Sequence, residues 1–470
     1  MTEMITQDNK TSFFKLFRQA IRGDIKDFTT GSIDRAIFLL AVPMVLEMVL
    51  ESSFALVDIY FVNKVSPAAA ATVGLTESSL TILYSLAWGL AMGATALIAR
   101  RAGEKDFKSA SSVAAQVILI ATAFSVLVSI FGIVFPKEIL RFMGADAGLV
   151  DEHYRFTQVM LGSNIVIMLL FVNNGIFRGA GDASVAMRSL IIANIINIIL
   201  DPLLIMGYGP FPKMELMGAA VATTIGRGCG VLYQFYHLFG GKDLVKLSVS
   251  QFRTDMKLIR SLLSTSSGAM FQFLIGSCSW IFLAKLVAES GVEATSGYFT
   301  AIRICIFTIL PAWGIANAAA TLTGQNLGAG HPGRAEKSVW RSAFLALCFF
   351  ILVGIVFFFF GEALMRFFTS NELAVKEGTK CLHILAIGYT CFAYGMVLTQ
   401  AFNGAGDSKT PTYINLFVFW LLQIPLAYLL VRYLGWGTTG VYVAINIAES
   451  VLAITSIIIF RKGKWKLVKV

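Results

Sequence analysis

The apolar segment 36–62 contains three carboxylic acids, Glu47, Glu51 and Asp58. At 100° per residue in an α-helix, spacings of four and seven residues put these side chains within about 40° of one another on one face. A charge at the centre of a bilayer costs about 2.5 to 3.5 kcal/mol on insertion scales, so an acid inside an apolar segment indicates a function. Carboxylates in a low dielectric can carry protons, and the same oxygen atoms suit a hard cation such as Na⁺.

Further polar side chains in three other apolar segments extend this set. They are Glu77 in segment 68–99, Asn194, Asn197 and Asp201 in segment 186–206, and Thr223 and Arg227 in segment 216–240. If the N-terminus is cytoplasmic, Asp58, Asp201 and Thr223 all fall toward the outer half of the membrane, so we expect them to meet. The residue types suit a proton and a sodium ion equally.

The individual acids differ in what they indicate. For Glu51 and Glu77, a role in ion binding and a structural hydrogen bond are equally good explanations, whereas Glu47 lies a turn nearer the cytoplasm and is the weaker candidate. The second half of the chain is poorer in acids, since Glu449 is the only acidic residue in its apolar segments apart from those near their ends. Gln272 and Arg303 are polar candidates there, and we expect Arg303 to pair with a helix end.

An internal repeat indicates which elements position these residues. The sequence Arg-Gly-Ala-Gly-Asp at 178–182 returns in the second half of the chain as Asn-Gly-Ala-Gly-Asp at 403–407, and the same offset superimposes Trp88 on Trp313. Repeats in a helical membrane protein are typical of secondary transporters, whose substrate and ion sites lie at the repeat interface. We interpret the Gly-Ala-Gly-Asp sequences as tight turns in which Asp182 and Asp407 cap the following helix.

The composition independently predicts a membrane protein, because 56% of the residues are hydrophobic, only 14% are charged and the mean hydropathy is +0.73. Twelve apolar segments are long enough to span a bilayer at about 20 residues each. They lie near residues 36–62, 68–99, 111–134, 155–177, 186–206, 216–240, 261–288, 295–322, 338–360, 380–402, 411–432 and 438–460. The fold class is therefore an all-α polytopic membrane protein.

An even number of spans in each repeat means that both repeats begin on the same side of the membrane, so we expect a parallel repeat about an axis along the membrane normal. The predicted organisation is a cytoplasmic N-terminal segment 1–30, an N-lobe 31–240, a cytoplasmic linker 241–260, a C-lobe 261–460 and a basic cytoplasmic tail 461–470. Apolar and basic residues alternate in segment 13–28, which resembles a helix on the inner membrane surface; a partly ordered tail is the alternative.

The net charge of +10 does not indicate nucleic-acid binding, because most of the 38 Lys and Arg residues fall in the tails and in loops expected to be cytoplasmic. The positive-inside rule accounts for this imbalance and places both termini in the cytoplasm. No cleavable signal peptide is recognisable. The six cysteines lack CxxC spacing and the four histidines are scattered, which argues against a metal framework or a membrane-embedded enzyme.

Several motifs together resemble the multidrug and toxic compound extrusion (MATE) family. They are the duplicated twelve-span plan, Pro43, the sequence Ala-Arg-Arg-Ala-Gly at 99–103, the two Gly-Ala-Gly-Asp turns, and Asn-Ile-Ile-Leu-Asp-Pro at 197–202. The resemblance implies a V-shaped pair of six-helix bundles that exports cationic or amphipathic compounds in exchange for protons or sodium ions. In members of the family, the positions that match Asp58, Asn197, Asp201 and Thr223 form the ion or proton site of the N-lobe.

The resemblance also implies a multi-pass protein of the cytoplasmic membrane that works as a monomer in the lipid bilayer, with no cofactor beyond its coupling ion, H⁺ or Na⁺. Acids are missing from segments 268–283 and 382–402, which favours the DinF-like and archaeal-like branch over the NorM type. A lipid-linked oligosaccharide flippase of the same superfamily is the alternative, against which the acid-rich N-lobe argues. A primary pump would need its own P-loop, and the sequence contains no GxxxxGK[ST].

Overall fold

The computed structural model describes residues 13–24, 27–62, 65–240 and 244–468, and every regular element in these residues is helical. The first half contains α1 (Phe13–Arg22), α2 (Ile33–Val62), α3 (Pro67–Gly103), α4 (Phe107–Val134), α5 (Pro136–Phe142), α6 (Ala147–Gly162), α7 (Asn164–Ala180), α8 (Ala183–Met206) and α9 (Leu216–Phe239). The second half contains η1 (Val249–Phe252), α10 (Met256–Ala288), α11 (Val292–Gly328), α12 (Pro332–Phe368), α13 (Glu372–Gly404), α14 (Lys409–Asn415), η2 (Leu416–Gln423), α15 (Ile424–Tyr428), η3 (Leu429–Tyr433), α16 (Thr438–Arg461) and η4 (Lys464–Leu467).

Helices occupy all twelve predicted spans. By length and composition, ten helical segments among the described residues could cross a membrane; α2, with its three acids, and α9, with Arg227, fall outside this group. α6 and α7 together form one span, and so do the short elements from Lys409 to Tyr433. The latter span contains two π-helical stretches, η2 and η3, beside Pro425, which lacks the amide hydrogen for a regular helical bond.

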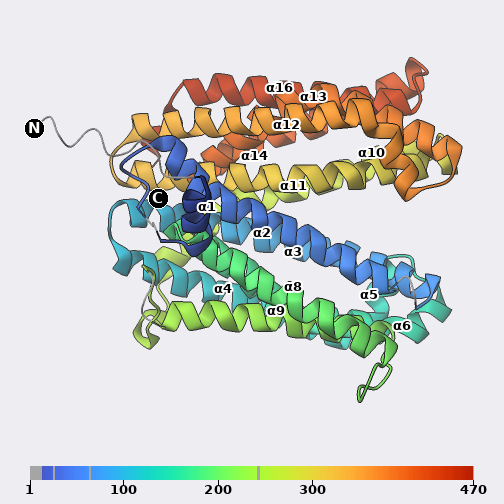
Figure 1. Ribbon diagram of the computed structural model, residues 1–470, viewed down its shortest axis with the longest axis horizontal. Helices are drawn as coiled ribbons and strands as arrows, with labels where there is room; N and C mark the ends of the chain where they lie inside the picture. The colour runs from blue at the N-terminus through green and yellow to red at the C-terminus, as the bar shows by residue number, and fades with distance from the viewer. Residues whose placement is uncertain (1–12, 25–26, 63–64, 241–243, 469–470) are drawn as a thin grey trace, which may run out of the picture.

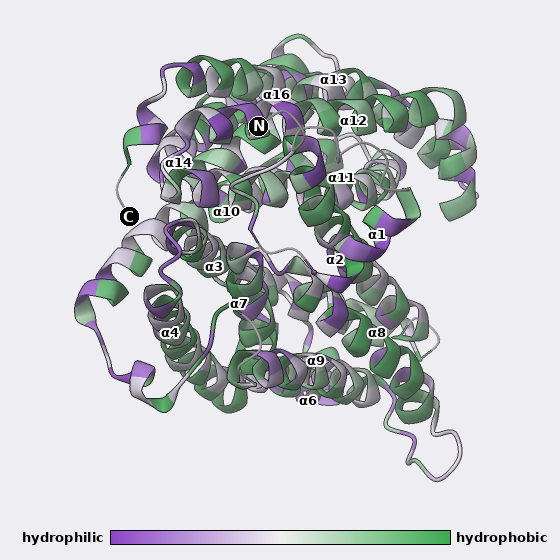
Figure 2. Ribbon diagram, turned by 60° about the vertical axis from the view of Figure 1, so that its left-hand side comes forward, coloured by the Kyte–Doolittle hydropathy of each residue, from purple (hydrophilic) through white to green (hydrophobic). Residues whose placement is uncertain are grey.

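The described spans form two lobes (Figure 1). One apolar core is built almost entirely from α2 to α9 and a second from α10 to α16 with the C-terminal Trp465. Apolar residues also cover much of the outside of both lobes, as Figure 2 shows, which is expected where lipid replaces water as the solvent. The lobes approach each other at the end that carries both termini and diverge toward the opposite end (Figure 1).

Pairs of equivalent glycines bring the lobes into close contact. A Cβ atom on Gly89 would lie 2.6 Å from the backbone nitrogen of Met270, and one on Gly314, the equivalent of Gly89 in the repeat, would lie 2.6 Å from the backbone nitrogen of Val45. Val45 and Met270 are related by the same offset. The contact is thus made twice with the lobes exchanged, as expected for a parallel repeat about an axis between them.

A second such pair lies nearer the end that carries the termini. A Cβ atom on Gly103 would be 2.0 Å from the carbonyl oxygen of Gln325, and one on its equivalent Gly328 would be 2.0 Å from that of Arg100. All these glycines lie in the second halves of α3 and α11. Only glycine allows backbones to approach so closely, so the lobes are closed against each other at this end of the molecule.

The two Gly-Ala-Gly-Asp sequences form tight turns, as predicted. Gly181 and Gly406 adopt left-handed backbone conformations, with φ of 85° and 87°. The predicted capping holds for Asp407, whose Oδ1 accepts a hydrogen bond from the Thr410 amide at 3.2 Å. It is wrong for Asp182, which caps no amide of α8; its Oδ1 accepts a hydrogen bond from the hydroxyl of Ser184 at 2.8 Å.

Candidate functional site

Four of the predicted site residues, Asp58, Asn197, Asp201 and Thr223, meet in the N-lobe. They come from the last turns of α2, the second half of α8 and the second turn of α9. Thr223 Oγ1 donates a hydrogen bond to Asp58 Oδ2 at 3.1 Å, and Asn197 Nδ2 donates to Asp201 Oδ1 at 3.2 Å. Asp58 also interacts with the side chains of Asn197 and Asp201. This cluster lies toward the end of the lobe remote from the termini.

The cluster is short of hydrogen-bond donors. Asn197 and Asp201 are completely buried, and three acceptor atoms, Asp58 Oδ1, Asn197 Oδ1 and Asp201 Oδ2, are buried without a hydrogen-bond partner. The two carboxyl groups are close enough to hydrogen-bond once one of them carries a proton. A buried acceptor without a donor costs about 1 to 3 kcal/mol, and a buried carboxylate costs more. The geometry therefore fits a proton or a small cation, either of which satisfies these oxygens.

Arg227 lies beside the cluster and is held by a second acid. Its Nη2 donates to Glu51 Oε1 at 3.1 Å, its guanidinium lies 4.7 Å from the centre of the Phe54 ring, and it also interacts with Tyr84. Because Arg227 is buried, it supplies a fixed positive charge close to Asp58. Glu51 is thus the partner of an arginine and lies outside the oxygen cluster.

Glu47 is remote from the cluster. It is fully buried near the middle of α2 and accepts a hydrogen bond from Arg178 Nη1 at 2.9 Å. In the C-lobe, Gln272 hydrogen-bonds with Asn403, the carbonyl of Ser408 and Thr412. Both residues connect the first span of their lobe to the turn after its fourth span.

The remaining predicted residues occupy three different environments. Asn194 is buried in α8 and its amide donates to the carbonyl oxygen of Leu190 at 2.8 Å, one turn earlier. Glu77 on α3 is exposed and lies within electrostatic range of Asp58 and Arg227, and more weakly of Arg303 on α11, so it stands beside the cluster. Arg303 is exposed on α11, and its pairing with a helix end stays a prediction. Glu449 is buried in α16.

A chain of aromatic rings crosses between the lobes, and reasoning from single residues of the sequence did not identify it. Trp88 of α3 lies 5.4 Å from Phe273 of α10, which stacks on Trp313 of α11 at 5.7 Å, while Tyr84 stacks on Trp88 at 6.1 Å. Trp88 is also more than a third exposed. Aromatic faces of this kind bind flat or cationic organic molecules. The equivalence of Trp88 and Trp313 in the repeat was the sequence signal that could have identified these neighbouring aromatic rings.

Two lobes of membrane helices related by a parallel repeat are the architecture of a membrane transporter. Comparison with known sequences agrees, since the profile of the MatE family matches residues 43–203 and 269–429. The chain therefore belongs to the MatE family of transporters.

Individual relatives extend along nearly the whole chain. A protein of Thermotoga maritima described as "Probable multidrug resistance protein NorM" is 26% identical over 435 residues, which cover 92% of this chain and 93% of that protein. The "Multidrug export protein MepA" of Staphylococcus aureus is 22% identical and covers 92% of this chain and 94% of that protein. A solved "outward-facing conformation of a multidrug resistance MATE family transporter" superposes with a TM-score of 0.86 at 26% identity, covering 98% of this chain and 100% of that chain.

Proposed function

We propose that this protein is a secondary active antiporter that exports cationic or amphipathic compounds in exchange for protons or sodium ions. The observation that carries the proposal is the cluster of three unpartnered acceptor oxygens on Asp58, Asn197 and Asp201. Binding of H⁺ or Na⁺ there would neutralise negative charge in a buried site, and release of the ion would restore that charge. Relatives whose names describe multidrug resistance and export support the drug substrate.

The closed end of the molecule suggests how the cycle runs. With both termini in the cytoplasm, closure at Gly89, Gly103, Gly314 and Gly328 would leave the lobes open toward the outside, where the cluster lies. An ion entering from outside would bind the cluster and weaken the binding of the exported compound, after which the loaded carrier would open inward. The difference in ion affinity between the two states supplies the coupling, because a ligand shifts an equilibrium only by its differential affinity.

One ion per exported molecule is already sufficient for useful transport. Each charge that moves inward supplies about 2.3 kcal/mol per 100 mV, which corresponds to roughly fortyfold accumulation. The four cluster residues belong to the N-lobe. In the C-lobe, Glu449 is buried, and among the described residues no second acid is recorded beside it. We therefore assign ion coupling to the N-lobe, as in the DinF-like branch.

The second candidate function is a flippase for lipid-linked oligosaccharides, which would require positive charge to hold a pyrophosphate. Arg227 and Arg178 are the arginines that lie beside the N-lobe acids, and each is bound to a glutamate, which disfavours this alternative.

The test of antiport is ion flux in proteoliposomes with proton and sodium gradients imposed separately. A cationic dye on the closed side should stimulate flux of one of the two ions. Flux of neither ion would contradict antiport.

A further inference from the structure

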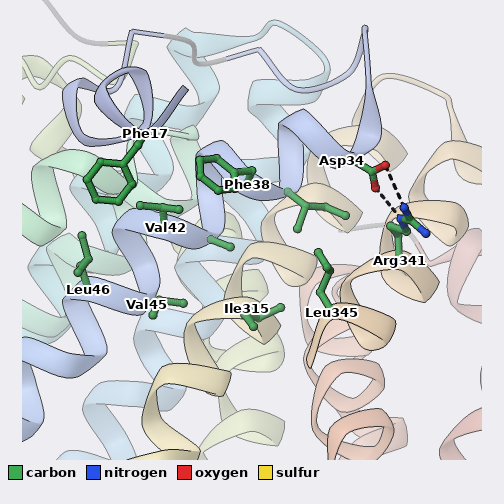
Figure 3. A pocket seen from close by; sticks show the side chains of 11 residues that line it. Phe17, Asp34, Phe38, Val42, Val45, Leu46, Ile315, Arg341 and Leu345 are labelled. Atoms are coloured by element: carbon green, nitrogen blue, oxygen red, sulfur yellow. Dashed lines mark hydrogen bonds and ion pairs between the residues drawn. The ribbon is translucent and has the colours of Figure 1, made fainter. Parts of the chain in front are cut away.

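A groove open to the outside of the bundle lies between the two lobes at the end that carries the termini (Figure 3). It has a volume of about 640 Å³, within the range of about 300 to 1,000 Å³ of small-molecule sites. Its floor is almost entirely apolar. Val42, Val45 and Leu46 of α2 form one wall, and Ile315 of α11 and Leu345 of α12 form the other.

The amphipathic helix α1 borders the groove through Phe17, on the opposite side from Asp34 and Arg341 (Figure 3). Phe17 of α1 lines the groove beside Phe38 of α2, while Lys15 and Arg18 on the same helix are exposed. Figure 1 shows α1 running across the direction of α2, as a helix at a membrane surface does. Arg188 of α8 fixes its last turn by donating to the carbonyl oxygens of Ile21 at 2.8 Å and Arg22 at 2.6 Å.

The groove is polar only where it reaches the level of α1. There Arg341 of α12 donates two hydrogen bonds to Asp34 of α2, with distances of 2.6 and 3.2 Å (Figure 3). These bonds use Nε and Nη2, so Nη1 remains available to an anion. Lys337 is exposed one turn earlier on α12, on the same helix face as Arg341. Asp34 and Arg341 are the charged residues that line the groove, and exposed Lys15, Arg18 and Lys337 lie on helices α1 and α12, which contribute to the groove lining.

The depth of the groove matches one leaflet of a bilayer. From Asp34 to Leu46, α2 advances twelve residues, or about 18 Å, and the hydrocarbon of one leaflet is about 15 Å thick. The order of residues along this depth is a basic mouth, two phenylalanines and then aliphatic side chains. We propose that the groove holds one acyl chain of an anionic phospholipid, with its phosphate at Arg341 and Lys337.

Such a lipid would favour one state of the protein. Because α2 belongs to one lobe and α11 and α12 to the other, the groove has both walls only while the lobes are closed at this end. A ligand that binds one state better shifts the equilibrium toward that state. The bound lipid therefore stabilises the closed arrangement.

The test measures lipid retained by the delipidated full chain in detergent, using palmitoyl-oleoyl phosphatidylglycerol and the zwitterionic phosphatidylcholine with the same chains. Native mass spectrometry should show one phosphatidylglycerol held in preference to phosphatidylcholine, and thermal unfolding should shift upward with phosphatidylglycerol. Leu345→Trp, which fills the groove from a side chain 39% exposed, should abolish both effects. Leu352→Trp, on the exposed face of the same helix, is the matched control and should abolish neither.

The headgroup is tested by the double variant Lys337→Gln with Arg341→Gln. Loss of two basic residues near an anionic group should weaken phosphatidylglycerol retention by roughly thirtyfold and remove the preference over phosphatidylcholine. Lys108→Gln with Lys464→Gln removes two exposed charges from the same end of the molecule and should have little effect. Equal retention of both lipids by the wild type, or full retention by folded Leu345→Trp, would overturn the proposal. If Leu345→Trp lost dye transport and still retained the lipid, the groove would be an entry path for substrates and the proposal would fail.

Discussion

Glu47 and Gln272 are equivalent residues of the two lobes, and each binds the residue that precedes the Gly-Ala-Gly turn of its own lobe. Glu47 accepts from Arg178 at 2.9 Å, whereas Gln272 and Asn403 exchange two hydrogen bonds of 3.0 Å. Arg178 and Asn403 are themselves equivalent, at the same offset that relates Glu47 to Gln272. The same connection is thus made by an ion pair in one lobe and by neutral amides in the other.

This equivalence predicts that charge at the Glu47 position is dispensable when both partners change. Arg178→Asn alone leaves a buried carboxylate unpaired and should destabilise the protein by about 3 to 5 kcal/mol. Adding Glu47→Gln recreates the amide pair of the C-lobe and should recover most of this loss together with dye export. Thermal unfolding and transport in proteoliposomes measure both effects. A double variant that is folded but inactive would show that Glu47 takes part in coupling.

Closure between the lobes predicts that adding a single methyl group at a contact glycine strongly reduces export. A Cβ atom on Gly89 would lie within 2.7 Å of backbone atoms of Met270, so Gly89→Ala should hold the lobes apart and reduce export severalfold or more. Gly74→Ala in the same helix is the matched control, because nothing lies within 4 Å of its Cβ position. Cross-linking between cysteines placed at Glu104 and Ala329 measures closure, because the backbone nitrogens of these residues lie 3.1 and 3.0 Å from the Cβ positions of Gly328 and Gly103 in the opposite lobes. Normal cross-linking in Gly89→Ala would contradict the proposed contact.

Sequence reasoning predicted the fold well because twelve apolar segments and a repeat at one offset leave few arrangements. It also predicted from their similar depths that Asp58, Asp201 and Thr223 meet, and the resemblance to the MATE family added Asn197 to this set. It ranked Glu47 as the weaker candidate and left the role of Glu51 open, but it did not predict that each of them pairs with an arginine. All three acids share a helix face, but which of them meets an arginine depends on how α7 and α9 pack beside α2. Helical periodicity in one segment does not contain this information.

The buried acid of α16 provides a prediction that a substitution has little effect on export. Glu449 is buried in α16, remote from the oxygen cluster of the N-lobe. Glu449→Gln keeps the shape of the side chain and should leave ion-driven export largely intact, because Glu449 belongs to the opposite lobe from the oxygen cluster. Transport rate normalised to membrane abundance is the measurement. Loss of export at normal abundance would place part of the coupling in the C-lobe.

Orientation in the membrane is testable by labelling cysteines in a background without the six native ones. The excess of basic residues at the end carrying the termini predicts that cysteines at Lys105 and Lys337 react only from the cytoplasm. A cysteine at Lys213, in the connection between α8 and α9 at the opposite end, should react only from outside. Labelling of a cysteine at Lys105 from outside would show that the orientation is the reverse of the predicted one. The end at which the lobes are closed would then face the outside.

The cluster itself gives the most direct prediction, that Asp58→Asn and Asp201→Asn each abolish ion-driven export while the protein stays folded. Asparagine has nearly the same shape and brings an amide donor to the unpartnered oxygens, so packing and stability should survive. It cannot take up a proton, and it lacks the charge that attracts Na⁺.

The variants should therefore bind a cationic dye without dependence on pH or sodium, because an ion that no longer distinguishes the two states cannot shift their equilibrium. Asp151→Asn is the matched control, since Asp151 is exposed in α6 at the same end of the molecule and pairs with Lys137. Dye binding and counterflow measured over a range of pH and sodium concentration separate binding from coupling. Export against a gradient at wild-type rates by both cluster variants would move the ion site elsewhere in the protein.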